Sequence, residues 1–257
     1  MPLIKNDLFS DAFFLSSVQS GQIHFISQQT EDCNIESTVQ RSEAQGLVIW
    51  SGADMASHHP RRISQTCPCL HFAPLPGIRI RIDANQAWSP KQAVKLLNQM
   101  QDKGLDIEFV EQPVKAHDFE GLQYVTQRSY VPVLADESVF SPEDALKIMQ
   151  MGAADMVNIK LMKCGGLYNA LKITSTAEVY GVECMIGCML EAKISVNAAV
   201  HLACAKQIIT KIDLDGPVLC SEDPILGGAV FNEREITVSN DPGLGIHGIQ
   251  GIRYLVD

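Results

Sequence analysis

The stretch from Arg79 to Gly166 contains four short apolar runs that each end in an ionisable residue: RIRID at 79–83, IEFVE at 107–111, VPVLAD at 131–136 and ADMVNIK at 154–160. Successive ends are separated by roughly 24 to 28 residues, the length of one unit of strand plus helix. Parallel strands of a barrel present their C-terminal ends on one face. We therefore expect the side chains that close these strands to converge: Asp83, Glu111, Asp136 and Lys160.

Helical segments alternate with these strands and continue the pattern toward the end of the chain. The expected helices span 89–104, 117–129, 141–152, 165–181 and 191–206. Two of them begin with Ser-Pro, at Ser89 and Ser141, which is typical of an N-cap followed by proline in the first turn. Further strands are expected at 182–189 and 207–217, and a small hairpin at 224–246. This alternation predicts a parallel sheet with helices outside, with six strands after Ile78 where a closed barrel has about eight.

Residues 1–77 have a different character from the rest of the chain. They are rich in Ser, Gln and His, and no lysine occurs between Lys5 and Lys91. Their apolar clusters are short and keep neither helical nor strand periodicity, so we expect one or two short strands plus loop. The expected division is thus an atypical N-terminal segment, 1–77, and a barrel domain, 78–257. Whether the first segment is divergent, truncated or disordered stays open.

The composition excludes several classes of function. A net charge of −10 argues against a nucleic-acid partner, because no basic stripe is present to neutralise phosphates. No apolar run approaches the ~18 residues of a membrane span, and the N-terminus is a poor secretory signal. The eight cysteines include a pair at Cys67 and Cys69 without a second pair at zinc spacing. We interpret Cys184, Cys188 and Cys204 as small buried hydrophobic residues of a reduced, cytoplasmic protein.

Three carboxylates at matching strand ends are suited to a hard cation such as Mg²⁺, because they supply oxygen ligands and leave room for substrate. Each acid also has a simpler explanation. Asp83 could make an Asx turn, Glu111 could be a solvated strand end and Asp136 could cap a helix. Without a metal, however, three such carboxylates in one partly desolvated mouth would repel one another. Their joint occurrence therefore favours a metal site.

Lysine and acidic residues beside these carboxylates suggest proton transfer and the binding of a cation. Lys160 lies two residues after Asn158, so both should point to one face, and an amine near Mg²⁺ can act as a base. Lys163 is its rival, although we place it in a loop beyond the strand. Asp213 and Asp215 also share a face and would suit a substrate ammonium, or they could form an acidic turn. Glu191 is expected in the first turn of a helix beside the site, in a supporting role.

The residues quoted above form a set of motifs. They read D-A-N-Q-x-W at 83–88, E-Q-P at 111–113, A-D-E-S at 135–138, N-I-K-L-M-K-x-G-G at 158–166, G-C-M-L-E at 187–191 and D-L-D-G-P at 213–217. Together they resemble the enolase superfamily, in its mandelate racemase/muconate lactonizing branch, and are most similar to the epimerases of dipeptides such as L-Ala-D/L-Glu. The resemblance extends from about residue 78 to the C-terminus.

The resemblance implies a (β/α)₇β barrel with a Mg²⁺-dependent isomerase site. Asp83, Glu111 and Asp136 would hold Mg²⁺, which stabilises the enolate formed when the substrate α-proton leaves. Lys160 would be the acid/base on one face of the α-carbon. The Asp213–Asp215 pair, supported by Asn158 and Glu191, would bind the dipeptide, with Asp213 and Asp215 on its ammonium.

One element of the family pattern is missing. Inversion of a centre needs a second base, which in the family is the last lysine of a K-x-K motif at the second barrel strand. The corresponding region, near residues 50–56, contains no lysine, and residues 1–77 do not resemble the family's capping domain. The first strands and the cap therefore look replaced or lost.

Three readings of the function follow. The first is a dipeptide epimerase that is impaired because the second base is absent. The second is another reaction of the branch, such as that of muconate cycloisomerase or o-succinylbenzoate synthase, against which the Asp213–Asp215 motif argues because those substrates lack an ammonium. The third is a non-catalytic barrel remnant. Such a remnant would expose sheet edges that can pair with another chain. The expected partners are therefore a dipeptide substrate and further copies of the chain in a homo-oligomer.

Overall fold

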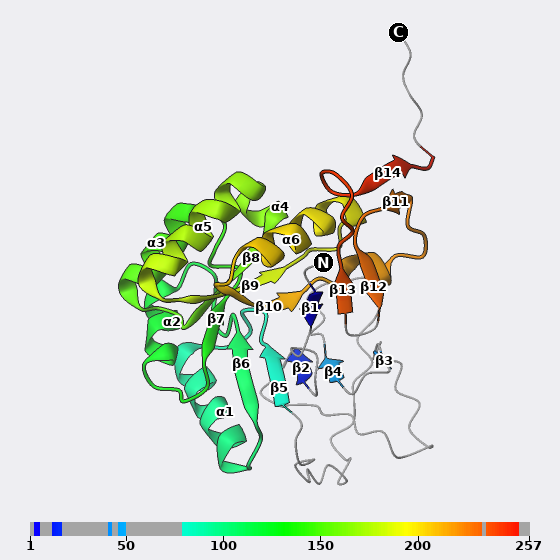
Figure 1. Ribbon diagram of the computed structural model, residues 1–257. Helices are drawn as coiled ribbons and strands as arrows, with labels where there is room; N and C mark the ends of the chain where they lie inside the picture. Colours follow the sequence, from blue (N-terminus) through cyan, green and yellow to red (C-terminus); the bar gives the residue numbers. More distant parts are fainter. Residues whose placement is uncertain are drawn as a thin grey trace, which may run out of the picture. The chain divides into compact units, whose positions relative to one another are not determined.

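The computed structural model describes residues 3–5, 12–16, 41–42, 46–49, 79–232 and 235–251 (Figure 1). The chain divides into two compact units, which are described separately: Asp11–Val133, and Leu134–Asp257 together with Met1–Ser10. Residues 50–56, Cys67 and Cys69 lie outside the described residues. The expected boundary at residue 77 falls beside them and stays a prediction.

The first unit is built from two parallel strand–helix repeats. Its elements are β5 (Arg79–Asp83), α1 (Pro90–Asp102), β6 (Ile107–Glu111) and α2 (Phe119–Thr126). β5 pairs in parallel with β6 and, on its other side, with β2 (Ala12–Ser16). β2 pairs with β4 (Gly46–Ile49), and β4 pairs with the antiparallel β3 (Arg41–Ser42). Together with β1, the described part of residues 1–77 thus contains four short strands, where we had expected one or two.

Helix packing in the first unit follows the apolar spacing of α1. The side chains that it buries are Ala93, Leu96, Leu97 and Met100, which recur at helical intervals. They face one side of the helix, whereas its polar residues are exposed or partly exposed. The strands bury side chains on both faces: Ile82, Phe109 and Val110 are almost fully enclosed. Arg81 is also 1% exposed, and its guanidinium Nε donates to Glu108 at 2.7 Å and lies over the ring of Phe109.

The second unit continues the same alternation. Its elements are β7 (Val133–Ala135), α3 (Pro142–Met151), β8 (Met156–Lys160), α4 (Leu161–Cys164), α5 (Leu167–Tyr180), β9 (Glu183–Gly187), α6 (Lys193–Ala205) and β10 (Ile209–Asp213). The strands pair in parallel in the order β7, β8, β9, β10. Across the described part of both units, six parallel strands follow residue 78, as predicted. The helix α4 was not predicted, since we had placed these residues in a strand end and a loop.

The chain ends in small antiparallel sheets. After the 3₁₀ helix η2 (Gly216–Leu219), β12 (Val230–Asn232) and β13 (Glu235–Thr237) form the predicted hairpin, and β1 (Leu3–Lys5) pairs with β13. β11 (Ile225–Gly227) pairs with β14 (Ile246–Ile249). The buried side chain of Asn197 on α6 forms hydrogen bonds with these segments. Its amide donates to Leu244 O at 2.5 Å and accepts from Ala229 N at 2.9 Å.

Helix starts show what proline and serine contribute. In α3, Ser141 Oγ accepts from Asp144 N at 3.1 Å, so Ser141 is the N-cap that the sequence predicts. In α1, Ser89 has the same extended backbone, but its side chain makes no capping hydrogen bond. Asp118 caps α2 by accepting from Gly121 N at 2.8 Å. Proline in the first turn is thus common to α1 and α3, whereas side-chain capping is not.

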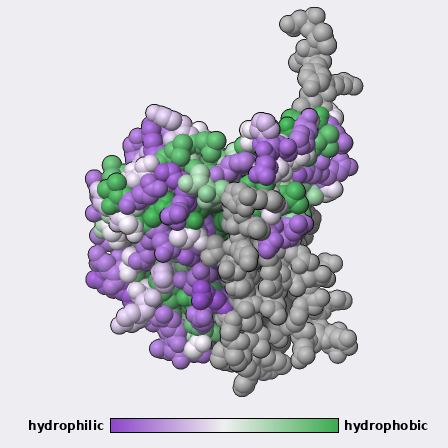
Figure 2. Space-filling model, in the orientation of Figure 1, coloured by the Kyte–Doolittle hydropathy of each residue, from purple (hydrophilic) through white to green (hydrophobic). Residues whose placement is uncertain are grey.

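Much of the described surface on the face shown in Figure 2 is polar. Figure 2 shows hydrophobic residues in patches between hydrophilic ones, including over α4 and α5. Exposed large apolar residues there are Met162, Leu167, Tyr168 and Leu171. Within the residues that the structure describes, no helix has both the length and the apolar character needed to cross a membrane.

Candidate active site

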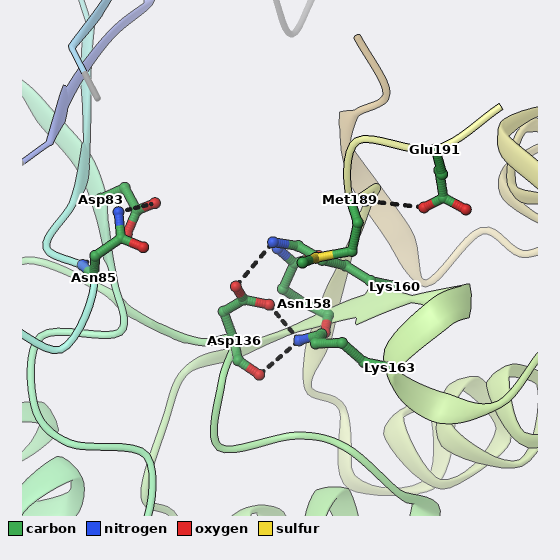
Figure 3. A network of polar contacts seen from close by, with 8 residues as sticks. All are labelled: Asp83, Asn85, Asp136, Asn158, Lys160, Lys163, Met189 and Glu191. Atoms are coloured by element: carbon green, nitrogen blue, oxygen red, sulfur yellow. Dashed lines mark hydrogen bonds and ion pairs between the residues drawn. The ribbon is translucent and has the colours of Figure 1, made fainter. Parts of the chain in front are cut away.

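In the first unit, the predicted acids Asp83 and Glu111 close neighbouring strands. They are register partners at the ends of β5 and β6, and Glu111 is buried at 3% exposure. The carboxylate of Asp83 accepts from the backbone N and the side-chain Nδ2 of Asn85, both at 2.9 Å (Figure 3). The Asx turn that we considered as the simpler explanation of Asp83 is therefore present. The turn orients the carboxylate and leaves its chemistry as an oxygen donor intact.

The turns that follow these two acids are held in an unusual backbone conformation. Asn85, Gln86 and Gln112 have φ angles of +43°, +63° and +33°, in the left-handed region that favours glycine. Hydrogen bonds between the turns maintain this geometry: Gln86 N donates to Gln112 O at 2.8 Å, and Gln86 Oε1 accepts from Ala116 N at 3.0 Å. Strain of this kind clusters at functional sites, where the surrounding structure over-determines it.

In the second unit, Asp136 is held by two lysines (Figure 3). It follows β7 directly and is 5% exposed. Lys160 Nζ donates to Asp136 Oδ2 at 2.9 Å, and Lys163 Nζ contacts Oδ1 and also donates to the backbone oxygen of Asp136 at 2.6 Å. Burial acts to raise the pKa of Asp136, but the charges of Lys163 and Lys160 outweigh it, so that the pKa lies below its ordinary value. Asp136 is therefore an anion embedded between two cations.

The two lysines differ in how firmly they are held. Lys163 lies on the short helix α4, its side chain is 5% exposed, and it also donates to Asn158 O at 3.3 Å. Lys160 closes β8, and its side chain is 14% exposed. Lys160 donates to one oxygen of the Asp136 carboxylate, whereas Lys163 contacts that carboxylate and two backbone oxygens. Lys160 is thus the better placed of the two to exchange a proton with a ligand, and Lys163 is a fixed counter-charge that we had taken for a loop residue.

Lys160, Gly187 and Asp213 form a row across three strands. Gly187 at the end of β9 is the register partner of Lys160 on β8 and of Asp213 on β10. Asn158, fully buried on β8, lies on the same side as Lys160, because a side chain at Gly187 would meet both. This confirms that Asn158 and Lys160 share a face. We name these residues the strand-end row: Lys160, Gly187 and Asp213.

Asp215 follows the row in the turn after β10. Burial, and then the charge of Asp213, raise the pKa of Asp215 to about 7. Cys188 lies beside it: its Sγ is 3.9 Å from Asp215 Oδ1 and accepts from Gly216 N at 3.4 Å. Burial, with a smaller effect of Asp213, raises the pKa of the Cys188 thiol to about 12. This thiol is therefore neutral at physiological pH. Of the three cysteines expected to be buried, Cys184 is buried, whereas Cys188 and Cys204 are only half-buried.

The expected place of Glu191 was wrong. Helix α6 begins at Lys193, so Glu191 precedes the helix and does not lie in its first turn. Its Oε1 accepts from Met189 N at 2.9 Å and ties the loop after β9 (Figure 3). This contact makes Glu191 a loop-fixing residue in the structure. A substrate contact by Glu191 stays a prediction.

The donor set fits a hard cation in its chemistry. Asp83, Glu111 and Asp136 are carboxylates that close consecutive parallel strands, and oxygen ligands of this kind are those that Mg²⁺ prefers. Asp83 and Glu111 belong to the first unit and Asp136 to the second. Within residues 79–232 and 235–251, no three Asp, Glu, His or Cys side chains are grouped so as to hold a metal ion. The metal site therefore stays a prediction.

Comparison with known proteins gives the context of this site. Residues 55–248 match the family model described as enolase C-terminal domain-like. The L-Ala-D/L-Glu epimerase of Clostridium acetobutylicum is 62% identical over 172 residues, which are 67% of this chain and 48% of that protein. The chain thus spans about half the length of the curated relatives that it matches.

Solved structures give the same result. A substrate-liganded complex of the L-Ala-D/L-Glu epimerase from Bacillus subtilis matches with a TM-score of 0.66 and 46% identity, over 67% of this chain and 48% of that one. The dipeptide epimerase from Enterococcus faecalis, complexed with Mg and the dipeptide L-Leu-L-Tyr, matches with a TM-score of 0.64 and 47% identity, over 66% and 48%. These likenesses confirm the predicted fold class, a (β/α) barrel of the enolase type.

Proposed function

The chain belongs to the enolase C-terminal domain-like family, and we propose that it carries the acid–base half of a Mg²⁺-dependent epimerase of dipeptides such as L-Ala-D/L-Glu. The strand-end row is the observation that carries this proposal. It presents an amine, a gap and a carboxylate side by side on three adjacent strands. A dipeptide has the complementary order of groups, an acidic α-proton and, one residue away, a free ammonium.

Lys160 is the proposed acid/base on one face of the substrate α-carbon. Its Nζ forms an ion pair with Asp136 at 2.9 Å, and its side chain is largely shielded from water. A positioned amine of this kind can take a proton and return it, which typically contributes a factor of about 10² to 10⁴ in rate. Lys163 stays bound to Asp136 and to Asn158 O, so it would keep Asp136 in place while Lys160 moves.

Asp213 and Asp215 are the proposed ligands of the substrate ammonium. The pKa of Asp215 is raised to about 7, chiefly by burial and then by Asp213. A substrate cation binds the ionised carboxylate and competes with the proton. Below the pKa of about 7 the carboxyl group is neutral, so dipeptide affinity should fall as the pH is lowered through this value.

Asp83, Glu111 and Asp136 would hold Mg²⁺ in this proposal. Bound Mg²⁺ would withdraw electron density from the substrate carboxylate and so make the α-proton more acidic. The chain itself would orient the ligands, through the Asx turn at Asp83 and the two lysines at Asp136.

Proton NMR of L-Ala-L-Glu with the protein and Mg²⁺ in D₂O tests the proposal. Exchange at one face predicts loss of the Glu α-proton signal. Inversion, seen as the L,D diastereomer, would require a second base, and the sequence near residues 50–56 contains no lysine for that role. Absence of exchange by the folded protein across a panel of dipeptides would refute the proposed activity.

Three variants make the test specific. Lys160→Met should abolish exchange, whereas Lys172→Met, which changes an exposed lysine on α5, should leave it unchanged. Asp213→Asn should weaken dipeptides far more than their N-acylated analogues, since only the former carry an ammonium. Equal effects on both ligands would make Asp213 a structural residue.

A further inference from the structure

Gly187 occupies the centre of the strand-end row, and its conformation does not explain why glycine is there. It is buried at the end of β9, in regular parallel pairing with Lys160 on one side and Asp213 on the other. Its φ angle is not among the positive values found at the turn glycines. Any residue could adopt this backbone, so the reason for glycine must lie in the space around it.

That space is already filled by the side chains of β8. A Cβ atom on residue 187 would lie 2.9 Å from Asn158 Oδ1 and 3.0 Å from Lys160 Cε. Real Cβ atoms hardly ever approach other atoms so closely. Asn158 is fully buried and cannot easily yield, whereas the Lys160 chain ends at the ion pair with Asp136. The clash caused by an added methyl group would therefore be relieved mainly by movement of the Lys160 side chain.

We propose that Gly187 is a positioning residue for Lys160: the missing side chain leaves the space over β9 across which the lysine reaches its working position. The catalytic part of this inference rests on the proposed function. Gly187 lies between the strand-end positions of Lys160 and Asp213, and neighbouring strands in a sheet are about 4.8 Å apart.

Gly187→Ala should lower the rate of α-proton exchange at saturating L-Ala-L-Glu by about 10- to 100-fold, because a shift of about 1 Å in a reacting group has effects of this size. KM should stay within about twofold, since ammonium binding is left to Asp213 and Asp215. The matched control is Gly248→Ala on β14, where the new Cβ would meet only Leu226 Cδ1 at 3.6 Å, an ordinary contact. An exchange rate for Gly187→Ala equal to that of the parent would overturn the inference.

A second measurement does not depend on activity. Lys160→Ala removes the contact with Lys160 Cε and leaves the one with Asn158, so Gly187→Ala should lower the Tm by several degrees in the parent and by clearly less in the Lys160→Ala background. Equal decreases in both backgrounds, or failure to fold in both, would overturn the inference. If the parent chain shows no exchange but the two decreases differ, the proposed function fails whereas the positioning of Lys160 by Gly187 stands.

Discussion

Asp215→Asn should stabilise the protein, and the gain should depend on pH. Asp215 lies in the turn after β10, and its pKa is raised from 3.8 to about 7 by burial and then by Asp213. The difference is about 3 units, and one unit corresponds to 1.36 kcal/mol, so the ionised group destabilises the folded state by up to about 4 kcal/mol. Because the side chain is only half-buried and solvent screens part of its charge, we expect about 2 to 4 kcal/mol.

The sign of the pH dependence follows from proton binding. Between about pH 4 and pH 7 the folded protein holds the Asp215 proton, whereas the unfolded chain has released it. The free energy of unfolding of the parent therefore decreases as the pH rises through this window, by up to about 1.4 kcal/mol per pH unit. Asparagine does not titrate. The advantage of Asp215→Asn should grow from pH 4 to pH 7 and then stay constant.

Urea unfolding at several pH values between 4.5 and 8.5 measures this difference, with equal m-values as the condition for comparing midpoints. Glu222→Gln is the matched control, because Glu222 is an exposed carboxylate of the same unit and its replacement should change little at any pH. A difference between Asp215→Asn and the parent that is flat across this range would refute the reasoning. It would mean that Asp215 is ionised at all these pH values in the folded protein.

Three further substitutions have expected outcomes. Asp136→Asn should abolish most Mg²⁺ binding by calorimetry and reduce the free energy of unfolding by about 3 to 5 kcal/mol, because two shielded ammonium groups lose their counter-charge. Unchanged Mg²⁺ affinity would remove Asp136 from the metal site. Ser141→Ala should reduce thermal stability by about 1 kcal/mol, whereas Ser89→Ala, which removes no capping bond, should have almost no effect. Equal losses would show that the hydroxyl of Ser141 contributes nothing. Asn197→Ala should cost about 2 to 4 kcal/mol in urea unfolding, since it leaves Leu244 O and Ala229 N unpaired, and a loss below about 1 kcal/mol would contradict this.

The sequence predicts an element of this fold well where residues close together in the chain determine that element. Ser141 and Asp118 are N-caps because their side-chain oxygens reach backbone groups only three residues away. The helix α4 was missed because four residues after a strand are too few to show a helical period. In α1 the apolar residues Val94, Leu97 and Met100 lie at helical intervals, yet Val94 is only half-buried, whereas Ala93 and Leu96 are buried. The orientation of a helix depends on its neighbours and not on its own sequence.

The site shows the same division between local and distant causes. Regular spacing predicts that acids close successive strands, and the register of Asp83 with Glu111 agrees with it. Spacing cannot predict that Lys163 contacts Asp136, because a four-residue helix turns it toward the preceding strand end. Nor can it predict the role of Gly187, which depends on a side chain 27 positions earlier in the sequence. The sequence offers one signal of this role: Gly187 lies at the end of a strand, where no turn requires a glycine.

The turns after β5 and β6 have a consequence for the order of folding. The left-handed geometry of Gln86 and Gln112 is fixed by hydrogen bonds between the two turns, so neither turn can be stable before its strands have paired. Residues inside the strands, such as Ile82 and Val110, can bury apolar surface as soon as the pair forms. We therefore expect φ-values near zero at the turns and higher ones inside the strands. The carboxylates of Asp83 and Glu111 would then reach their final places only after the rate-limiting step.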